Sequence, residues 1–122
     1  MARILIVDDS PTDVRVLSGM LERAGFQTLS ASSAEEGMVK ARQERPDLIL
    51  MDIIMPGVNG FQATRALSRD PETSSIPVII VTTKSMETDR IWGMRQGAKD
   101  FVPKPPNERD LVARIQTLLK AS

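Results

Sequence analysis

The stretch Ile4-Leu5-Ile6-Val7-Asp8-Asp9 introduces a pattern that recurs along this chain: a short apolar run followed directly by polar residues. Three later runs end in the same way, at Asp52, Thr82 and Lys104. If the runs are neighbouring parallel strands, their carboxyl ends open onto one crevice, which is where open α/β sheets bind ligands. The sequence therefore predicts three carboxylates, a hydroxyl group and an ammonium group in one small pocket.

Apolar runs and helix-like segments alternate along the sequence, which is typical of βαβ units around a mostly parallel sheet. Three runs are continuous in Ile, Leu, Val and Met, as expected of strands that helices cover on both faces. The second and fifth runs are more polar or interrupted, so they are predicted at the sheet edges. The predicted strands are Arg3–Val7, Gln27–Ala31, Asp47–Met51, Val78–Val81 and Asp100–Val102.

Helix boundaries are predicted from capping residues. Gly25 and Gly97 are expected to follow the ends of the first and fourth helices, and Asp70-Pro71 to end the third. Three helix starts carry a capping residue with an acidic residue three positions later. These pairs are Ser10 with Asp13, Ser33 with Glu36, and Asn107 with Asp110.

The composition excludes several classes of function. In 122 residues, 16 basic residues balance 16 acidic ones, so no overall field attracts nucleic acid or anionic lipid. The sequence has no cysteine and no histidine, which excludes thiol and histidine catalysis, disulfides and the usual zinc sites, so any metal must be held by oxygen. We expect one domain over residues 1–122 without an output module, a signal peptide or a membrane span, located in the cytoplasm.

Three carboxylates in one pocket require a cation. Two carboxylates about 4 Å apart repel by roughly 4 kcal/mol at an effective dielectric constant of about 20, and magnesium is a hard divalent cation that prefers oxygen ligands and bridges to phosphate. Asp8 and Asp9 form a pair suited to metal ligation. Asp52 stands alone after a central strand and is predicted to be a nucleophile toward a phosphoryl group, whose oxygens Thr82 and Lys104 would contact.

Each of these residues also has an ordinary structural explanation when it is taken alone. Asp8 and Asp9 could lie at the positive end of the first helix. Asp52 could be a turn residue, Thr82 a strand-end threonine, and Lys104 a solvated lysine on an edge strand. Their joint occurrence at four strand ends favours the shared pocket.

Four motifs in order carry a resemblance that covers the whole chain: Val7-Asp8-Asp9-Ser10, Met51-Asp52-Ile53-Ile54-Met55-Pro56-Gly57-Val58-Asn59-Gly60, Val81-Thr82 and Lys104-Pro105. Together they resemble the receiver domain of bacterial response regulators. The resemblance implies an α/β fold of the flavodoxin-like, CheY-like type. Its doubly wound sheet has five parallel strands in the order 2-1-3-4-5, with five helices.

The same resemblance implies how the acidic residues act. Asp52 would accept a phosphoryl group from a histidine kinase and form an aspartyl phosphate. Asp8, Asp9 and Asp52 would bind Mg²⁺ together with the backbone carbonyl group of Ile54. The protein would then be a signalling switch rather than an enzyme with a separate substrate, catalysing only its own magnesium-dependent phosphorylation and dephosphorylation.

The resemblance also implies the moving parts of a two-state switch. Thr82 would be the switch hydroxyl, drawn toward the phosphoryl group, and Phe101 would move into the space that Thr82 leaves. Lys104 would contact the phosphoryl group. The peptide bond between Lys104 and Pro105 would be cis, a geometry available at low cost only before proline.

Receivers commonly signal through the fourth helix, the last strand and the last helix, so partner contacts are predicted near Arg90, Trp92, Phe101 and Arg109. An exposed tryptophan suggests an interface anchor. The alternative is that Trp92 folds over Met86 or a neighbouring loop.

The exposure of Trp92 is itself a prediction from helical spacing. In the fourth helix, Ile91, Met94 and Ala98 share the predicted inward face. Trp92 lies about 100° away from Ile91 around the helix axis and is therefore predicted to be part-exposed.

Within the family, segments 59–65 and 76–84 look closest to PilH-type, stand-alone regulators of type IV pilus twitching motility. The expected partners are then a CheA-like histidine kinase and a downstream motility protein, with the chain itself a monomer. Two alternatives remain: a phosphate sink for the kinase, and a phosphorylation-independent binding module. A phosphatase of the haloacid dehalogenase type is disfavoured. In that class the nucleophile ends the first strand and an acid lies two residues later, where this chain has Ser10.

Overall fold

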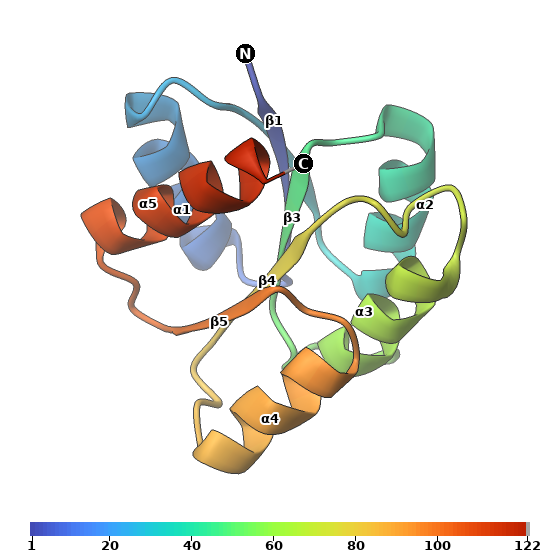
Figure 1. The fold of residues 1–122 in the computed structure, drawn as a ribbon. Coiled ribbons are helices and arrows are strands. Elements are labelled where there is room, and N and C mark those ends of the chain that lie inside the picture. The colour runs from blue at the N-terminus through green and yellow to red at the C-terminus, as the bar shows by residue number, and fades with distance from the viewer. Residues whose placement is uncertain (122) are drawn as a thin grey trace.

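The computed structural model describes residues 1–121, in which a parallel sheet lies between two groups of helices (Figure 1). Its five strands follow the order β2-β1-β3-β4-β5, and every neighbouring pair is parallel. This order confirms the doubly wound fold and places the two more polar strands, β2 and β5, at the edges. The strands are β1 Arg3–Val7, β2 Gln27–Ala31, β3 Leu48–Met51, β4 Val78–Thr82 and β5 Asp100–Pro103.

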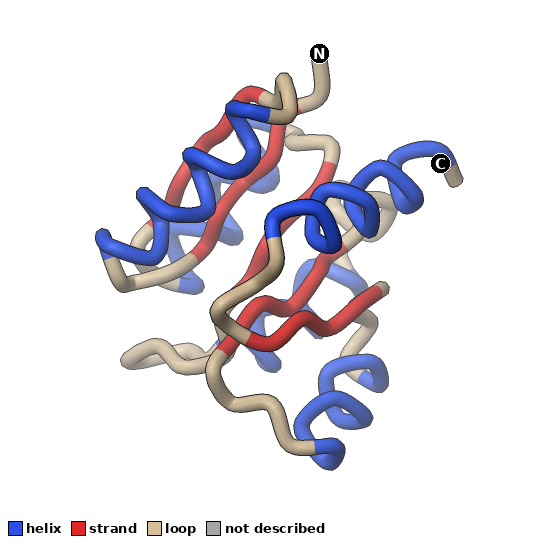
Figure 2. Tube along the Cα trace, turned by 90° about the vertical axis from the view of Figure 1, so that its left-hand side faces the viewer, coloured by secondary structure: helices blue, strands red, loops and turns tan. Residues whose placement is uncertain are grey.

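A helix follows each strand and returns the chain to the amino end of the sheet. Figure 2 shows the strands, in red, as a layer with helices on both sides. Helices α1 and α5 cover one face, and α2 and α3 cover the other (Figure 1). The helices are α1 Pro11–Arg23, α2 Ala34–Glu44, α3 Gly60–Arg69, α4 Glu87–Arg95 and α5 Glu108–Lys120.

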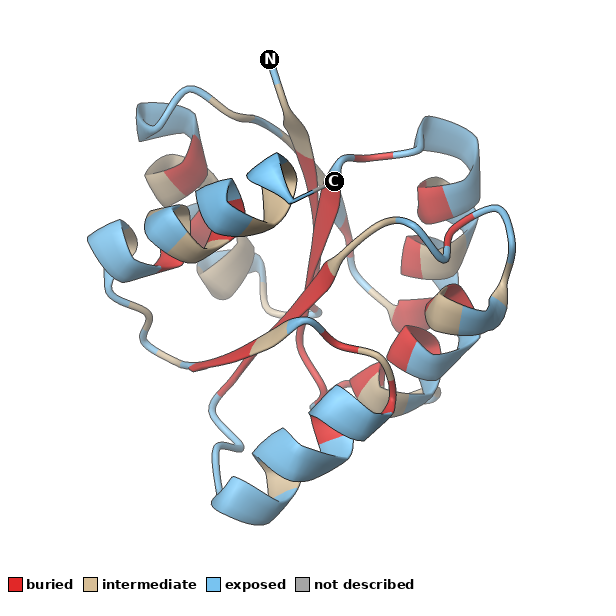
Figure 3. Ribbon diagram, in the orientation of Figure 1, coloured by how far each residue is buried: buried red, intermediate tan, exposed pale blue. Residues whose placement is uncertain are grey.

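The core has two layers because β1, β3 and β4 are buried on both faces (Figure 3). Alternate residues of a strand point to opposite faces of the sheet. Ile4 and Ile6 of β1 therefore pack with the inward residues of α1 and α5, whereas Leu5 and Val7 pack with those of α2 and α3. The continuous apolar runs of the sequence are explained by this double coverage.

The predicted helix starts are confirmed. Ser10, Ser33 and Asn107 each accept a hydrogen bond from the backbone amide three residues later, at 3.2, 3.1 and 3.0 Å. Asn59 caps α3 in the same way and forms a capping box with Gln62, a start that the sequence analysis did not predict. These side chains satisfy amides that the first turn of a helix leaves without a partner.

The predicted inward face of α4 is wrong in two of its three residues. Ile91 and Met94 are 41% and 38% exposed, and only Ala98 is buried. The helix instead turns Gly93 toward the sheet, where a Cβ atom would lie 2.6 Å from Cδ1 of Ile80. A bare glycine backbone therefore makes the close contact, and the larger apolar side chains of α4 are left outside.

The two ends of the described chain lie at the amino end of the sheet (Figure 1). Met1, Ala2, Asp47 and Leu119 line one shallow hollow there. The carboxyl ends of the strands, with the predicted site, lie on the opposite side. Over residues 1–121, no helix combines the length and the apolar character that crossing a membrane requires.

Candidate functional site

The acidic residues meet at the carboxyl edge of the sheet because β1 and β3 are neighbours in register. Val7 pairs with Met51, so the residues that follow them, Asp8 and Asp52, leave the sheet side by side. Carboxylate oxygens of Asp8, Asp9 and Asp52 all lie within 4.8 Å of one another. The pocket predicted from the strand ends is therefore present.

Short turns fix the orientation of two of these carboxylates. Oδ1 of Asp8 accepts a hydrogen bond from the amide of Ser10 at 2.9 Å, and Oδ1 of Asp52 accepts one from the amide of Ile54 at 3.0 Å. An aspartate that binds an amide two residues later stabilises its own turn. The Oδ2 atom of each residue remains directed into the pocket.

Lys104 reaches this pocket from the end of β5. Its Nζ atom donates to Oδ2 of Asp8 at 2.6 Å, of Asp13 at 2.8 Å and of Asp52 at 2.9 Å. A lysine ammonium group has three donors, so each donor has a carboxylate partner. The Lys104 side chain is only 8% exposed, which makes it a buried counter-ion rather than a solvated edge lysine.

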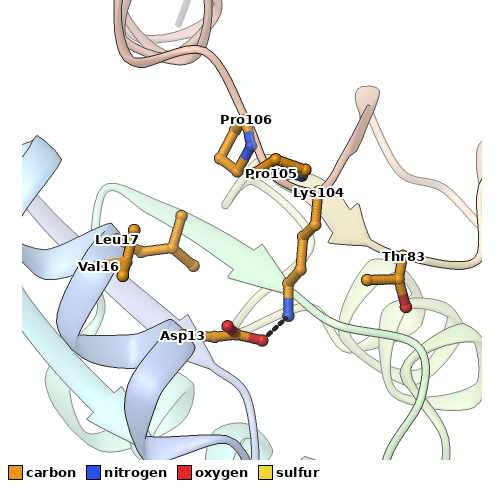
Figure 4. A pocket seen from close by; sticks show the side chains of 7 residues that line it. All are labelled: Asp13, Val16, Leu17, Thr83, Lys104, Pro105 and Pro106. Carbon is orange, nitrogen blue, oxygen red and sulfur yellow. Dashed lines mark hydrogen bonds and ion pairs between the residues drawn. The ribbon is translucent and has the colours of Figure 1, made fainter.

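Asp13 is the member of this network that the sequence analysis missed. The sequence predicts it only as the acidic residue in the first turn after the Ser10 cap, and its backbone amide donates to the Ser10 hydroxyl oxygen. Its carboxylate belongs to the first turn of α1 and points across to Lys104 (Figure 4). Nothing in the local sequence signals this contact, because it depends on how α1 packs against the loop after β5.

Burial and hydrogen bonding have opposite effects on the pKa of Asp8, and also on the pKa of Lys104. Burial raises the pKa of Asp8, and the hydrogen bonds from Lys104 and Ser10 reduce that rise without cancelling it. For Lys104, burial opposes the charged form, but hydrogen bonds to Asp13, Asp8 and Asp52 outweigh it and raise the pKa above its usual value. The ammonium group is therefore firmly protonated.

The acidic cluster fits a hard divalent cation. It offers only oxygen ligands from three carboxylates, which is the donor set that magnesium prefers. Lys104 balances only part of this negative charge. A cation on Asp8, Asp9 and Asp52 would therefore relieve the remaining repulsion among the carboxylates.

Thr82 ends β4 and is fully buried. Its Oγ1 atom accepts a hydrogen bond from the amide of Lys84 at 3.2 Å. The backbone amide of Lys104 binds the carbonyl oxygen of Thr82 at 2.8 Å, which ties the two strand ends together. The peptide bond between Lys104 and Pro105 is cis.

The predicted partner face needs a correction at Phe101, because this side chain is buried. It is only 6% exposed and packs against Ile53, Ile80 and Ala98. Gly93 lets α4 approach the same part of the sheet closely, because a Cβ atom there would lie 2.6 Å from Cδ1 of Ile80. Phe101 is therefore part of the core in this conformation and offers no surface to a partner.

The other three residues of the predicted partner face are exposed. Arg90 and Arg109 lie on the surface, and Arg90 donates to Glu87 at 2.6 Å. Trp92 is 48% exposed, as predicted from its helical position, and Met86 is 71% exposed. The alternative in which Trp92 is buried over Met86 is therefore not observed.

Comparison with known proteins agrees with this geometry. Residues 4–116 match the family model of the response regulator receiver domain. Protein PilH of Pseudomonas aeruginosa is 60% identical over 119 residues, which cover 98% of this chain and 98% of PilH. Several further relatives contain additional sequence, since the chain covers 26% to 52% of their length.

Solved structures share the fold over almost the whole chain. Chemotaxis protein CheY4 of Vibrio cholerae superposes with a TM-score of 0.89 at 30% identity, over 97% of this chain and 98% of CheY4. The receiver domain of a Pseudomonas aeruginosa sensor histidine kinase superposes with a TM-score of 0.90 at 27% identity, over 98% of both chains. That structure contains a magnesium ion in its active-site cleft. On the family match, the PilH identity and the shared fold, this chain belongs to the response regulator receiver domains.

Proposed function

We propose that Asp52 accepts a phosphoryl group from a histidine kinase and that the aspartyl phosphate changes how the protein binds its partner. One observation carries this proposal: the Asp52 carboxylate lies within the acidic cluster and 2.9 Å from Nζ of Lys104. A nucleophile, a cation site and a fixed positive charge are thus within reach of one phosphoryl group.

In the proposed transfer, a carboxylate oxygen of Asp52 attacks the phosphorus atom of a phosphohistidine. A P–O bond forms as the P–N bond breaks, and its electron pair returns to the imidazole nitrogen, which takes a proton from solvent. Lys104 provides positive charge beside the phosphoryl oxygens. Mg²⁺ held by Asp8, Asp9, Asp52 and the carbonyl oxygen of Ile54 would add further positive charge there.

The proposed switch begins at Thr82. Its hydroxyl group, which now accepts from the Lys84 amide, would turn toward the phosphoryl group and release that amide. The loop that leads into α4 would then be free to move. Because Phe101 is already buried, the switch proposed here does not require an inward movement of Phe101.

The similarity to PilH supports a finer proposal. We assign the chain to type IV pilus twitching motility, with a CheA-like kinase as phosphodonor and a motility protein as target. The 60% identity to PilH over 98% of both chains supports this assignment. A cytoplasmic location follows from a kinase donor, and the balanced charge argues against nucleic-acid binding.

The test is phosphorylation by acetyl phosphate in the presence of Mg²⁺, measured as protein-bound phosphate that hydroxylamine releases. Wild type should be labelled, and Asp52→Asn should not. Asp47→Asn is the matched control, because Asp47 is an aspartate just before the other end of the same strand. Absence of label on the wild type would contradict the proposal and favour the binding module.

The decay of the label separates the two remaining roles of the phosphorylated protein. A phosphate lifetime long enough to alter partner binding supports a signal. Rapid loss of phosphate, with no change in Trp92 fluorescence, would favour the phosphate sink.

A further inference from the structure

We propose that Asp13 is a positioning residue for Lys104: it keeps the ammonium group beside the phosphorylation site once a cation has taken over the Asp8 and Asp52 carboxylates. This inference rests on the proposed function of Asp52. It concerns a residue outside the acidic cluster and a contact between α1 and the loop after β5.

Lys104 divides its three donors among three carboxylates. Two donors go to Asp8 and Asp52, and the third goes to Asp13 at 2.8 Å. The Asp13 side chain is 41% exposed, compared with 2% for Asp8 and 9% for Asp52. Asp13 is thus the most exposed of the three partners of Lys104.

The orientation of Asp13 differs from that of an acidic residue that only supports the start of a helix. Its backbone amide is already satisfied by Ser10. Its carboxylate binds Lys104, which is 91 residues away in the sequence. The interaction therefore holds the loop of Lys104 and Pro105 against the first turn of α1.

The binding of a divalent cation should change the balance among these partners. Oxygens of Asp8 and Asp52 would turn to the cation, and the cation would repel the ammonium group. Asp13 does not belong to the acidic cluster over residues 1–121, so its carboxylate stays available to Lys104. Without Asp13, Lys104 would lose its remaining anionic partner before the phosphoryl group arrives.

A double-mutant cycle tests this role by measuring the rate of Asp52 phosphorylation by acetyl phosphate at saturating Mg²⁺. Asp13→Asn should slow the reaction roughly fivefold, the effect of one partly exposed charge contact. In a Lys104→Met background the same change should alter the rate less than about twofold. Asp13→Glu, which keeps the carboxylate, should restore most of the wild-type rate.

Asp110→Asn is the matched control. Asp110 is also the third residue of its helix and also has its amide capped, by Asn107, but its carboxylate binds Arg114 on the same helix. Its substitution should leave the phosphorylation rate unchanged. The inference would be overturned if Asp110→Asn slowed phosphorylation as much as Asp13→Asn does. It would also be overturned if Asp13→Asn slowed phosphorylation equally in the wild-type and Lys104→Met backgrounds.

A second measurement does not depend on phosphorylation. In ¹⁵N-lysine-labelled protein with Mg²⁺, the Lys104 ammonium signal, identified by its loss in Lys104→Met, should persist in wild type and disappear in Asp13→Asn. Persistence of that signal in Asp13→Asn would overturn the inference. Absence of phosphate label on wild type would instead remove the proposed function, while this spectrum would still report whether Asp13 holds Lys104.

Discussion

Gly60 lies so close to the backbone around Asp52 that a larger residue does not fit. A Cβ atom at this position would overlap the carbonyl oxygen of Asp52 and lie 2.7 Å from the Cα atom of Ile53. Backbone atoms cannot rotate away as a side chain can. We therefore expect Gly60→Ala to lower the free energy of unfolding by about 3 kcal/mol, measured by urea denaturation.

Gly19→Ala provides the control for this prediction. Gly19 lies inside α1, and its added Cβ atom would be 3.3 Å from the flexible end of Arg23. Alanine favours a helix over glycine, so this change should stabilise the protein by about 0.5 kcal/mol. Similar losses for both variants would show that the backbone contact at Gly60 is not the cause.

The buried carboxyl group of Asp8 makes the stability of the fold depend on pH. Burial raises its pKa above the usual value of 3.8, so the folded state binds the proton more tightly than the unfolded state does. The contribution of this group to stability is therefore full below pH 3.8 and is lost as the pH rises through the raised pKa.

The variant Asp8→Asn should reveal this loss when no divalent cation is present. We expect Asp8→Asn to be more stable than wild type at neutral pH in EDTA, with a difference that shrinks as the pH falls toward 4. Thermal unfolding over a pH series measures it. A difference that does not change with pH would contradict the role assigned to the Asp8 charge.

At the scale of the element, α4 differs from the other helices in what it buries. Its contact with the sheet is made by Gly93, and Trp92 remains half-exposed while Phe101 of β5 is buried beneath the helix. We expect Trp92→Ala to cost less than about 1 kcal/mol. Phe101→Ala should cost about 3 to 5 kcal/mol.

Urea denaturation of the two variants measures this contrast, and fluorescence gives an independent check. A half-exposed Trp92 should be readily quenched by acrylamide in the native state. Protection of Trp92 from the quencher, together with a large loss of stability in Trp92→Ala, would mean that α4 packs in a different orientation.

These elements show which parts of the fold could be predicted from sequence. Strands such as Arg3–Val7 are continuous apolar runs, and helix starts such as Ser10 are fixed by local hydrogen bonds, so both were predicted correctly. The orientation of α4 was not predicted correctly, because the helix faces the sheet with Gly93, and a glycine is not recognised as an inward residue from hydrophobic spacing. The Asp13 contact was also missed, because only tertiary packing brings α1 to the loop of Lys104.

At the scale of the whole molecule, one cation should stabilise the entire fold, because the acidic cluster joins β1 to β3 at the centre of the sheet. A ligand that binds only the folded state, at about 100 times its dissociation constant, adds about 2.7 kcal/mol. We expect Mg²⁺ to raise the melting temperature of wild type, measured by calorimetry.

Variants of the cluster test where this stabilisation originates. Asp9→Asn should reduce it strongly, because Asp9 is an exposed member of the cluster that can be changed with little effect on the core. Glu22→Gln, which removes an exposed charge from α1, should leave it unchanged. An equal response to Mg²⁺ in all three proteins would place the cation elsewhere.

The hollow shared by Met1, Ala2 and Leu119 brings the first residues and the last helix together, on the side away from Asp52. Chains whose ends are close together commonly tolerate circular permutation. A short glycine-serine linker could therefore join the ends, and new ends could be opened in the exposed turn near Pro71. Such a rearranged chain would carry a fluorescent reporter at the end of α3, on the side of the sheet opposite Asp52, where the label does not block the site.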